Sequence, residues 1–160
     1  MDVTLRIYDE QALVDRLTAL DRRSKTAFAA SCAQSLLPLF ERYAKSAGVP
    51  ELGARLGAIV AAAWAAASGV EADVRGHQDE AEAMVPSDGD GWTLETGYGQ
   101  NAAAAAAYAI RTWLTDDAQE AAWAARQVYE LADYAELAGN PRLDQNTSLA
   151  HSRGNCLRLC

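Results

Sequence analysis

The chain has 160 residues and a net charge of −8, and 50% of its residues are hydrophobic. This length suits one domain, and the composition is ordinary for a globular protein, which argues against disorder. The acidic balance argues against nucleic-acid binding, because that function needs clustered Lys and Arg to displace counterions from phosphates.

Alanine fills 35 of the 160 positions, and its runs include residues 61–63, 65–67 and 102–107. Alanine favours helices because its ordering costs no side-chain entropy. Its small methyl group also lets two helix backbones approach closely. The sequence therefore predicts an all-α fold, a compact bundle of about six helices.

The chain begins with a strand-like pattern and continues with helical ones. Residues 3–7 alternate apolar and polar side chains, and because no partner strand is visible, we expect a short extended arm lying on the helices. Six helical patterns follow, marked by apolar residues three to four apart and by start and stop residues. In chain order, the predicted helices cover approximately residues 10–20, 21–47, 51–68, 71–84, 98–114 and 117–138.

A few residues set the expected character of these helices. Asp9 and Asp21 are typical N-caps for the first two. Pro38 lies inside the second pattern and should kink or split it, since proline removes a backbone hydrogen bond. The third helix has a wide apolar surface and is expected to be central. Asp117, with Glu120 three residues on, resembles the capping box that starts a helix.

Two segments are expected to lack helical structure. Residues 87–91 (SDGDG) form a strong turn signal, and the loop should continue to about residue 97. Residues 141–160 show no periodicity and are expected to form a loosely ordered tail. The predicted organisation is thus a single helical domain over residues 1–140 followed by this tail.

The cysteines and the apolar stretches indicate a cytoplasmic protein. An odd number of cysteines, namely Cys32, Cys156 and Cys160, does not make a disulfide framework, and we expect Cys32 to be a small buried hydrophobic residue. The first residues show no secretory signal. The longest uncharged apolar stretch, residues 57–70, is shorter than the ~20 residues that span a bilayer.

Three groups of residues together resemble a known family. They are YDEQAL (8–13) followed by RL (16–17); FAASCAQSLLP (28–38); and GQNAA (99–103) followed by LT (114–115) and AAWAAR (121–126). These motifs resemble the YjaG-like family of small helical bacterial proteins, a domain of unknown function, over about residues 8–138. The resemblance implies a helical fold and transfers no catalytic or cofactor residue. The tail departs from the family's helical end.

Charge is spread unevenly along the chain. Residues 1–69 hold eight basic and seven acidic side chains (+1), residues 70–140 hold three and fourteen (−11), and residues 141–160 hold three and one (+2). The negative electrostatic potential of residues 70–140 would repel polyanions and attract a basic partner. The alternative is a solvated surface that serves only solubility.

The most concrete functional prediction is a non-enzymatic protein-binding protein. Amphipathic aromatic residues beside carboxylates are typical of protein contact surfaces, although a ring that covers the edge of the core would look the same. Small acidic helical proteins without chemistry of their own are also similar in general character to immunity proteins, which neutralise bacterial toxins. The expected partner is a basic protein, for example a toxin domain. The residues expected to bind it are Asp79, Glu80, Glu82, Asp88, Asp90, Trp92, Glu95, Trp123 and Tyr134.

Two interpretations from other classes remain open. If residues 71–84 are helical, Asp73, His77 and Glu80 share one face, which could serve a metal-dependent or small-molecule enzyme, with a divalent metal held by these side chains. A helical metal site needs further ligands from other helices, and no second set is visible, so we expect no cofactor. The third interpretation is a homodimeric structural protein that packs through its alanine-rich helices.

Overall fold

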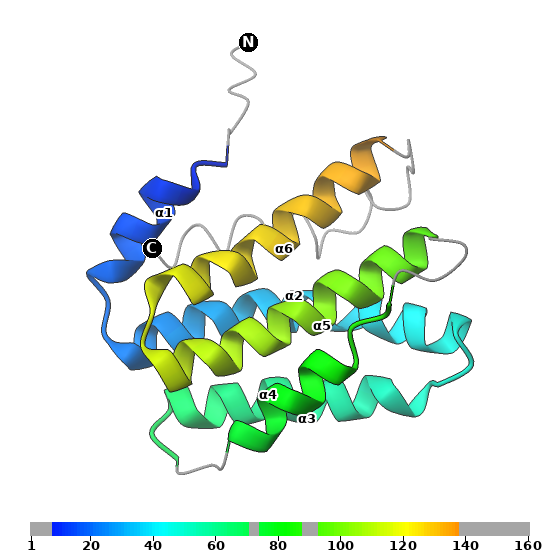
Figure 1. Ribbon diagram of the computed structural model, residues 1–160, viewed down its shortest axis with the longest axis horizontal. Helices are drawn as coiled ribbons and strands as arrows, with labels where there is room; N and C mark the ends of the chain where they lie inside the picture. Colours follow the sequence, from blue (N-terminus) through cyan, green and yellow to red (C-terminus); the bar gives the residue numbers. More distant parts are fainter. Residues whose placement is uncertain (1–7, 71–73, 88–92, 138–160) are drawn as a thin grey trace.

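The computed structural model describes residues 8–70, 74–87 and 93–137, and the side chains among them as far as residue 132. This part of the chain is all-α, with six helices and no strand (Figure 1). The all-α bundle of about six helices that the sequence predicts is therefore confirmed. The helices are α1 (Glu10–Thr18), α2 (Arg22–Ser46), α3 (Glu51–Ala67), α4 (Arg75–Ala83), α5 (Leu94–Thr115) and α6 (Ala118–Leu137).

Aspartate side chains start the first two helices, as predicted. Oδ1 of Asp9 accepts a hydrogen bond of 3.0 Å from the backbone N–H of Ala12, and Oδ1 of Asp21 accepts one of 2.7 Å from that of Ser24. These bonds satisfy N–H groups that have no partner in the first helical turn. The same bonds favour the charged carboxylate, which lowers the pKa of Asp21 below its usual range.

Pro38 does not split α2, which continues through it to Ser46. The prediction of a split was wrong for a physical reason. Proline leaves the carbonyl group four residues earlier without its helical partner, and both Pro38 and Gln34 lie on the exposed side of α2. Water can therefore satisfy that carbonyl group, and no buried polar group results.

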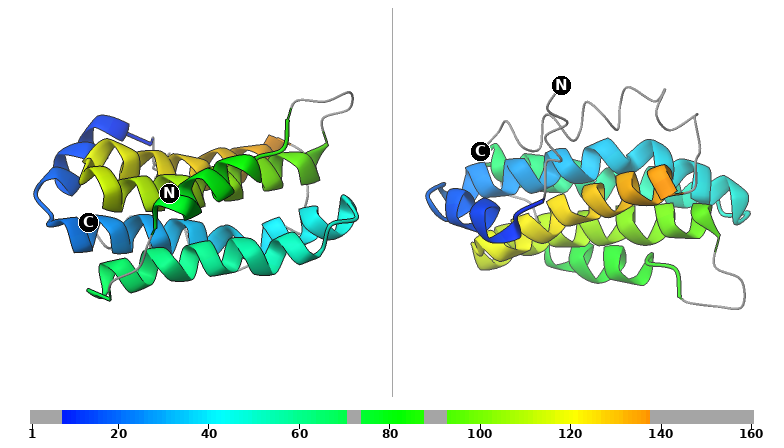
Figure 2. Two further views of the ribbon diagram at one scale, coloured as in Figure 1. Left: turned by 60° about the horizontal axis from the view of Figure 1, so that its bottom comes forward. Right: turned by 90° about the horizontal axis from the view of Figure 1, so that it is seen from above.

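Helices α2 and α5 form the centre of the bundle (Figure 2). Helix α3 packs beside α2, α6 packs on α5 and α2, α1 lies on α6, and α4 lies on α5. Six of the seven alanines of α5 are buried, and Gly99 approaches α2 so closely that an added Cβ would lie 2.5 Å from the ring of Tyr43. Small residues on α5, rather than the apolar surface of α3, thus define the central contact.

The start of α5 differs from the prediction. The loop was expected to continue to residue 97, but α5 begins at Leu94, because Oγ1 of Thr93 accepts a hydrogen bond of 3.2 Å from the N–H of Thr96. Gly97 therefore lies inside the helix rather than in the loop, and it is buried there.

Several expectations concern the ends of the chain and the cysteines. The predicted arm (3–7) and the predicted tail (141–160) lie outside the described residues. Cys32 is fully buried in α2, as expected. The expectation that it is simply a small hydrophobic residue outside any disulfide was wrong, because Cys32 is disulfide-bonded; the other two cysteines lie outside the described residues. No helix in the described ranges is both long enough and apolar enough to cross a membrane.

Candidate protein-binding face

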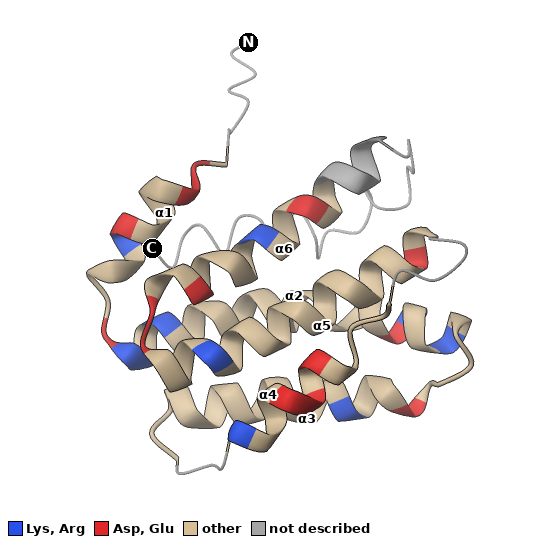
Figure 3. Cartoon of the chain, viewed as in Figure 1, with Lys and Arg blue, Asp and Glu red and all other residues tan. Residues whose placement is uncertain are grey.

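Helices α4, α5 and α6 lie side by side in that order on one surface of the bundle, which faces the viewer in Figure 1. We name this surface the α4–α5–α6 face and define it by Glu82 of α4, Tyr108 and Arg111 of α5, and Trp123 of α6. Acidic and basic residues lie along all three helices (Figure 3).

The Arg111 guanidinium connects the three helices. Its Nη2 atom lies 2.8 Å from Oε1 of Glu120, and its Nη1 atom lies 3.9 Å from Oε1 of Glu82. The same group lies over the ring of Tyr108, with 6.0 Å between Cζ and the ring centroid. One side chain of α5 therefore contacts a carboxylate of α4, a carboxylate of α6 and an aromatic ring.

Two aromatic rings form the centre of the face. The rings of Tyr108 and Trp123 are tilted by 49° and their centroids lie 5.6 Å apart, within the range of favourable aromatic pairs. Both side chains are half-buried, so each ring is held by a neighbour and still reaches the surface. Trp123 therefore covers the edge of the core and is also accessible from outside.

Glu120 belongs to the interior rather than to the accessible surface. It is 5% exposed, and the described part of the chain offers its Oε2 atom no hydrogen-bond partner. Burial raises the pKa of this carboxyl group, although the nearby Arg111 lowers it. Asp117 does cap the start of α6, since its Oδ1 atom accepts a hydrogen bond of 2.9 Å from the N–H of Gln119. The expected capping box is wrong, because the Glu120 carboxylate binds Arg111.

The predicted acidic side chains of α4 do not all lie on the same side of the helix. Asp79 and Glu82 are exposed, and Glu82 lies on the Arg111 side. Glu80 turns to the opposite flank, where its Oε1 atom lies 2.8 Å from Nη2 and 2.9 Å from Nε of Arg55. Glu80 is thus not part of the face. Glu95 is half-buried in the first turn of α5.

Ion pairs reduce the acidity that the sequence indicates. The described residues between 74 and 132, which leave out 88–92, contain eight carboxylates, and five of these lie in ion pairs. Two of the cations come from distant parts of the chain: Arg55 pairs with Glu80, and Lys25 pairs with Asp116 at 2.8 Å. The carboxylates outside these pairs are Asp79, Glu95 and Asp117.

Some predicted site residues cannot be placed. Asp73, Asp88, Asp90 and Trp92 lie outside the described residues, as does the side chain of Tyr134. The proposed anchor role of Trp92 and the stripe that joins Trp123 to Tyr134 therefore stay predictions.

The candidate metal ligands come only partly together. Nδ1 of His77 lies 3.7 Å from Oε2 of Glu80, while Asp73 lies outside the described residues. Within the described ranges, no three His, Cys, Asp or Glu side chains group as a metal site requires.

Tyr108 and Arg111 were not predicted as site residues from the sequence. Their spacing of three residues places them on one side of a helix, and Arg111 is one of only three basic residues between positions 70 and 140. The isolated positive charge of Arg111 in an acidic stretch was thus the sequence signal that could have identified it as the residue that connects α4, α5 and α6.

The fold and the face together define a small all-α bundle with a mixed aromatic and charged surface. Comparisons with protein-family models, with curated proteins and with solved structures found no match. The resemblance to the YjaG-like family stays a prediction.

Proposed function

We propose that this chain is a non-enzymatic protein-binding protein that engages a basic partner through the α4–α5–α6 face. Its most concrete form is an immunity protein that neutralises a basic bacterial toxin domain. The observation that carries the proposal is the position of Arg111, which joins the acidic helix α4 to the aromatic pair of Tyr108 and Trp123. Charge and aromatic anchors therefore lie on one surface.

Each part of this surface has a separate physical role. Tyr and Trp are frequent binding hot spots, and rings already held by neighbours lose little freedom when a partner binds. The exposed carboxylates of α4, Glu82 on the face and Asp79 one turn before it, would instead increase the rate of encounter with a cationic surface. Dissociation should thus depend on the rings, and association on the charges.

A gene neighbourhood gives the first test of the immunity form. An adjacent reading frame that encodes a large secreted protein with a basic C-terminal domain would supply the partner. If no such neighbour exists in any genome that carries this chain, the immunity form is wrong.

Stopped-flow binding of that basic domain tests the face itself. We expect Trp123→Ala to increase the dissociation rate by about 30-fold, the effect of a hot spot of roughly 2 kcal/mol. Trp123→Phe should keep most of the affinity. Thermal unfolding checks that both variants remain folded.

The charges are tested by the double variant Asp79→Asn/Glu82→Gln. We expect slower association and a weaker dependence on salt, with little change in dissociation. The matched control is Glu41→Gln/Glu51→Gln, which neutralises two exposed carboxylates on α2 and α3. If both double variants slow association equally, only the overall charge matters and the face has no special role.

A further inference from the structure

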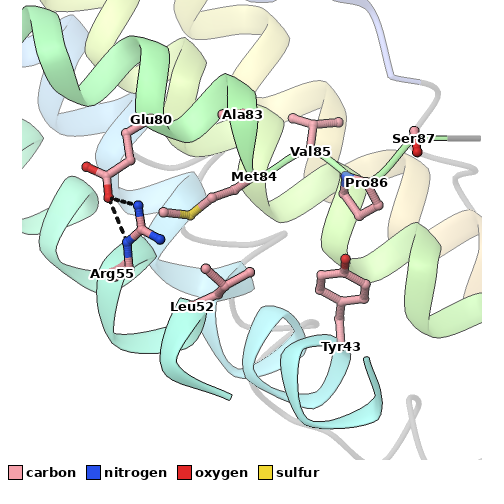
Figure 4. A pocket seen from close by; sticks show the side chains of 9 residues that line it. All are labelled: Tyr43, Leu52, Arg55, Glu80, Ala83, Met84, Val85, Pro86 and Ser87. Carbon is pink, nitrogen blue, oxygen red and sulfur yellow. Dashed lines mark hydrogen bonds and ion pairs between the residues drawn. The ribbon is translucent and has the colours of Figure 1, made fainter. Parts of the chain in front are cut away.

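A cleft lies on the other flank of α4, between α4, α3 and the end of α2 (Figure 4). Its volume is about 530 Å³, within the ~300–1,000 Å³ of typical ligand sites. The lining comes from three helices and the segment after α4: Tyr43, Leu52, Arg55, Glu80, Ala83, Met84, Val85, Pro86 and Ser87.

The middle of the cleft is apolar. Figure 4 shows Leu52 and the Met84 thioether between its two ends. Val85 adds to this surface and is 37% exposed, one of two large hydrophobic side chains that are exposed in the described ranges. Apolar surface of this kind gains free energy when a ligand covers it.

Hydrogen-bond donors lie at the two ends. At one end, the Nε and Nη2 atoms of Arg55 bind Glu80, which leaves Nη1 directed toward the cleft (Figure 4). At the other end stands the hydroxyl group of Tyr43, to which no described residue is hydrogen-bonded. Each donor can therefore bind an oxygen acceptor on a ligand.

Both donors are held in position before any ligand binds. Two nitrogen atoms of the Arg55 guanidinium contact Glu80, which favours one orientation of a side chain that is 55% exposed. The Tyr43 ring lies against Gly99 and beside Phe40, with 5.5 Å between the ring centroids. A site with fixed donors loses little conformational freedom on binding.

We propose that this cleft binds an uncharged peptide segment, with an apolar side chain in the middle and a backbone carbonyl group at each end. The charges on the wall are complementary to such a ligand. Arg55 and Glu80 neutralise each other in an ion pair. An anionic ligand would be attracted by Arg55 and repelled by Glu80, and a cationic ligand would be attracted by Glu80 and repelled by Arg55. A neutral carbonyl dipole gains the hydrogen bond from Nη1 without either repulsion.

The inference does not depend on the α4–α5–α6 face, because the two sites lie on opposite flanks of α4. It also predicts a ligand of different charge. The face is proposed to select a basic protein, whereas the cleft is proposed to select a neutral, apolar segment.

Methyl NMR of ¹³C-methionine-labelled protein tests the proposal directly. The chain has two methionines, so the Met84 signal needs only to be distinguished from that of Met1. Three probes share a leucine side chain and differ in charge: N-acetyl-leucinamide (neutral), N-acetyl-leucine (anionic) and leucinamide (cationic). We expect a saturable shift of the Met84 signal, with the neutral probe binding about two- to tenfold more tightly, the range of one net hydrogen bond.

Matched variants locate the binding. Ala83 and Ala61 are both exposed helical alanines, but only Ala83 lines the cleft. Ala83→Phe should fill the cleft and abolish the shift, while Ala61→Phe should leave it unchanged. Tyr43→Phe keeps the packed ring and removes one donor, so it should weaken the neutral probe about two- to tenfold.

The outcomes separate this proposal from the proposed function. Trp123→Ala should bind the neutral probe as the unmodified protein does. The cleft proposal is overturned if no probe shifts the Met84 signal, if a charged probe binds as tightly as the neutral one, or if Ala83→Phe still binds. None of these results bears on binding of a basic protein at the α4–α5–α6 face.

Discussion

Replacing Arg111 with Met would leave the Glu120 carboxylate buried without its cation. Glu120 is only 5% exposed, and its Oε2 atom has no hydrogen-bond partner among the described residues even in the unmodified protein. Methionine retains most of the apolar stem that packs beside Tyr108. The substitution therefore removes mainly the charge and the hydrogen bond of 2.8 Å.

The expected cost follows from the exposure of each partner. Removing one member of a fully buried pair costs about 3–5 kcal/mol. The Arg111 side chain is 37% exposed, so solvent already screens part of the interaction. We therefore expect Arg111→Met to lower the free energy of unfolding by roughly 2 kcal/mol near neutral pH, out of a typical 5–15 kcal/mol.

The pH dependence identifies the cause. Burial raises the pKa of Glu120, so the folded state binds its proton more tightly than the unfolded chain does. The associated stability is present at low pH and is lost as pH rises through the folded-state pKa. Without Arg111, which lowers this pKa, the loss at neutral pH is larger. The destabilisation by Arg111→Met should thus shrink as the pH falls toward the ordinary Glu range.

Urea unfolding followed by circular dichroism measures these differences. The double variant Arg111→Met/Glu120→Gln removes both charges and should be more stable near neutral pH than Arg111→Met, by about 1 kcal/mol. If the cost of Arg111→Met is the same at about pH 5 and about pH 7, or if the two substitutions are additive, the buried charge is not the source of the destabilisation.

Two further predictions use the same assay. Gly99→Ala should lower the free energy of unfolding by about 1–3 kcal/mol, because the new Cβ would lie 2.5 Å from the Tyr43 ring. The control Gly57→Ala has nothing within 4 Å of the new Cβ and should raise the free energy of unfolding by up to about 1 kcal/mol. Equal effects would contradict the close approach of α5 to α2. Tyr98→Phe should be neutral or stabilise by up to about 1 kcal/mol, because the buried hydroxyl has no partner among the described residues and burial raises its pKa. A clear loss of stability would show that this hydroxyl is hydrogen-bonded.

Signals for the fold were local and could therefore be found in the sequence. Asp9 and Asp21 bind N–H groups three residues away, and Gly48, with φ of +76°, follows the end of α2. The start of α5 was missed because the loop was predicted to continue to Gly97, whereas the helix begins at Leu94. Gly97 is instead buried inside α5, and burial of this kind depends on the tertiary structure.

The surface charge could not be predicted in the same way. Counting charges along residues 70–140 treats the stretch as one surface, but Arg55 and Lys25 reach into it from α3 and α2. The contact of Arg111 with Glu120 joins two helices across a turn, and neither residue carries a local signal for it. Pairing with distant segments thus neutralises carboxylates that a charge count along residues 70–140 treats as free.

Helix α4 shows how the charged residues divide the surface. It has nine residues, fewer than the ~12–15 that an isolated helix needs, so tertiary contacts must stabilise it. Burial of Val74 and Met84 contributes about 1.5–3 kcal/mol each, whereas exposed ion pairs contribute roughly 0–1 kcal/mol. Apolar contacts therefore hold α4 in place. The pairs of Glu80 with Arg55 and of Glu82 with Arg111 lie on its opposite flanks, and they separate a charge-neutral cleft from the α4–α5–α6 face.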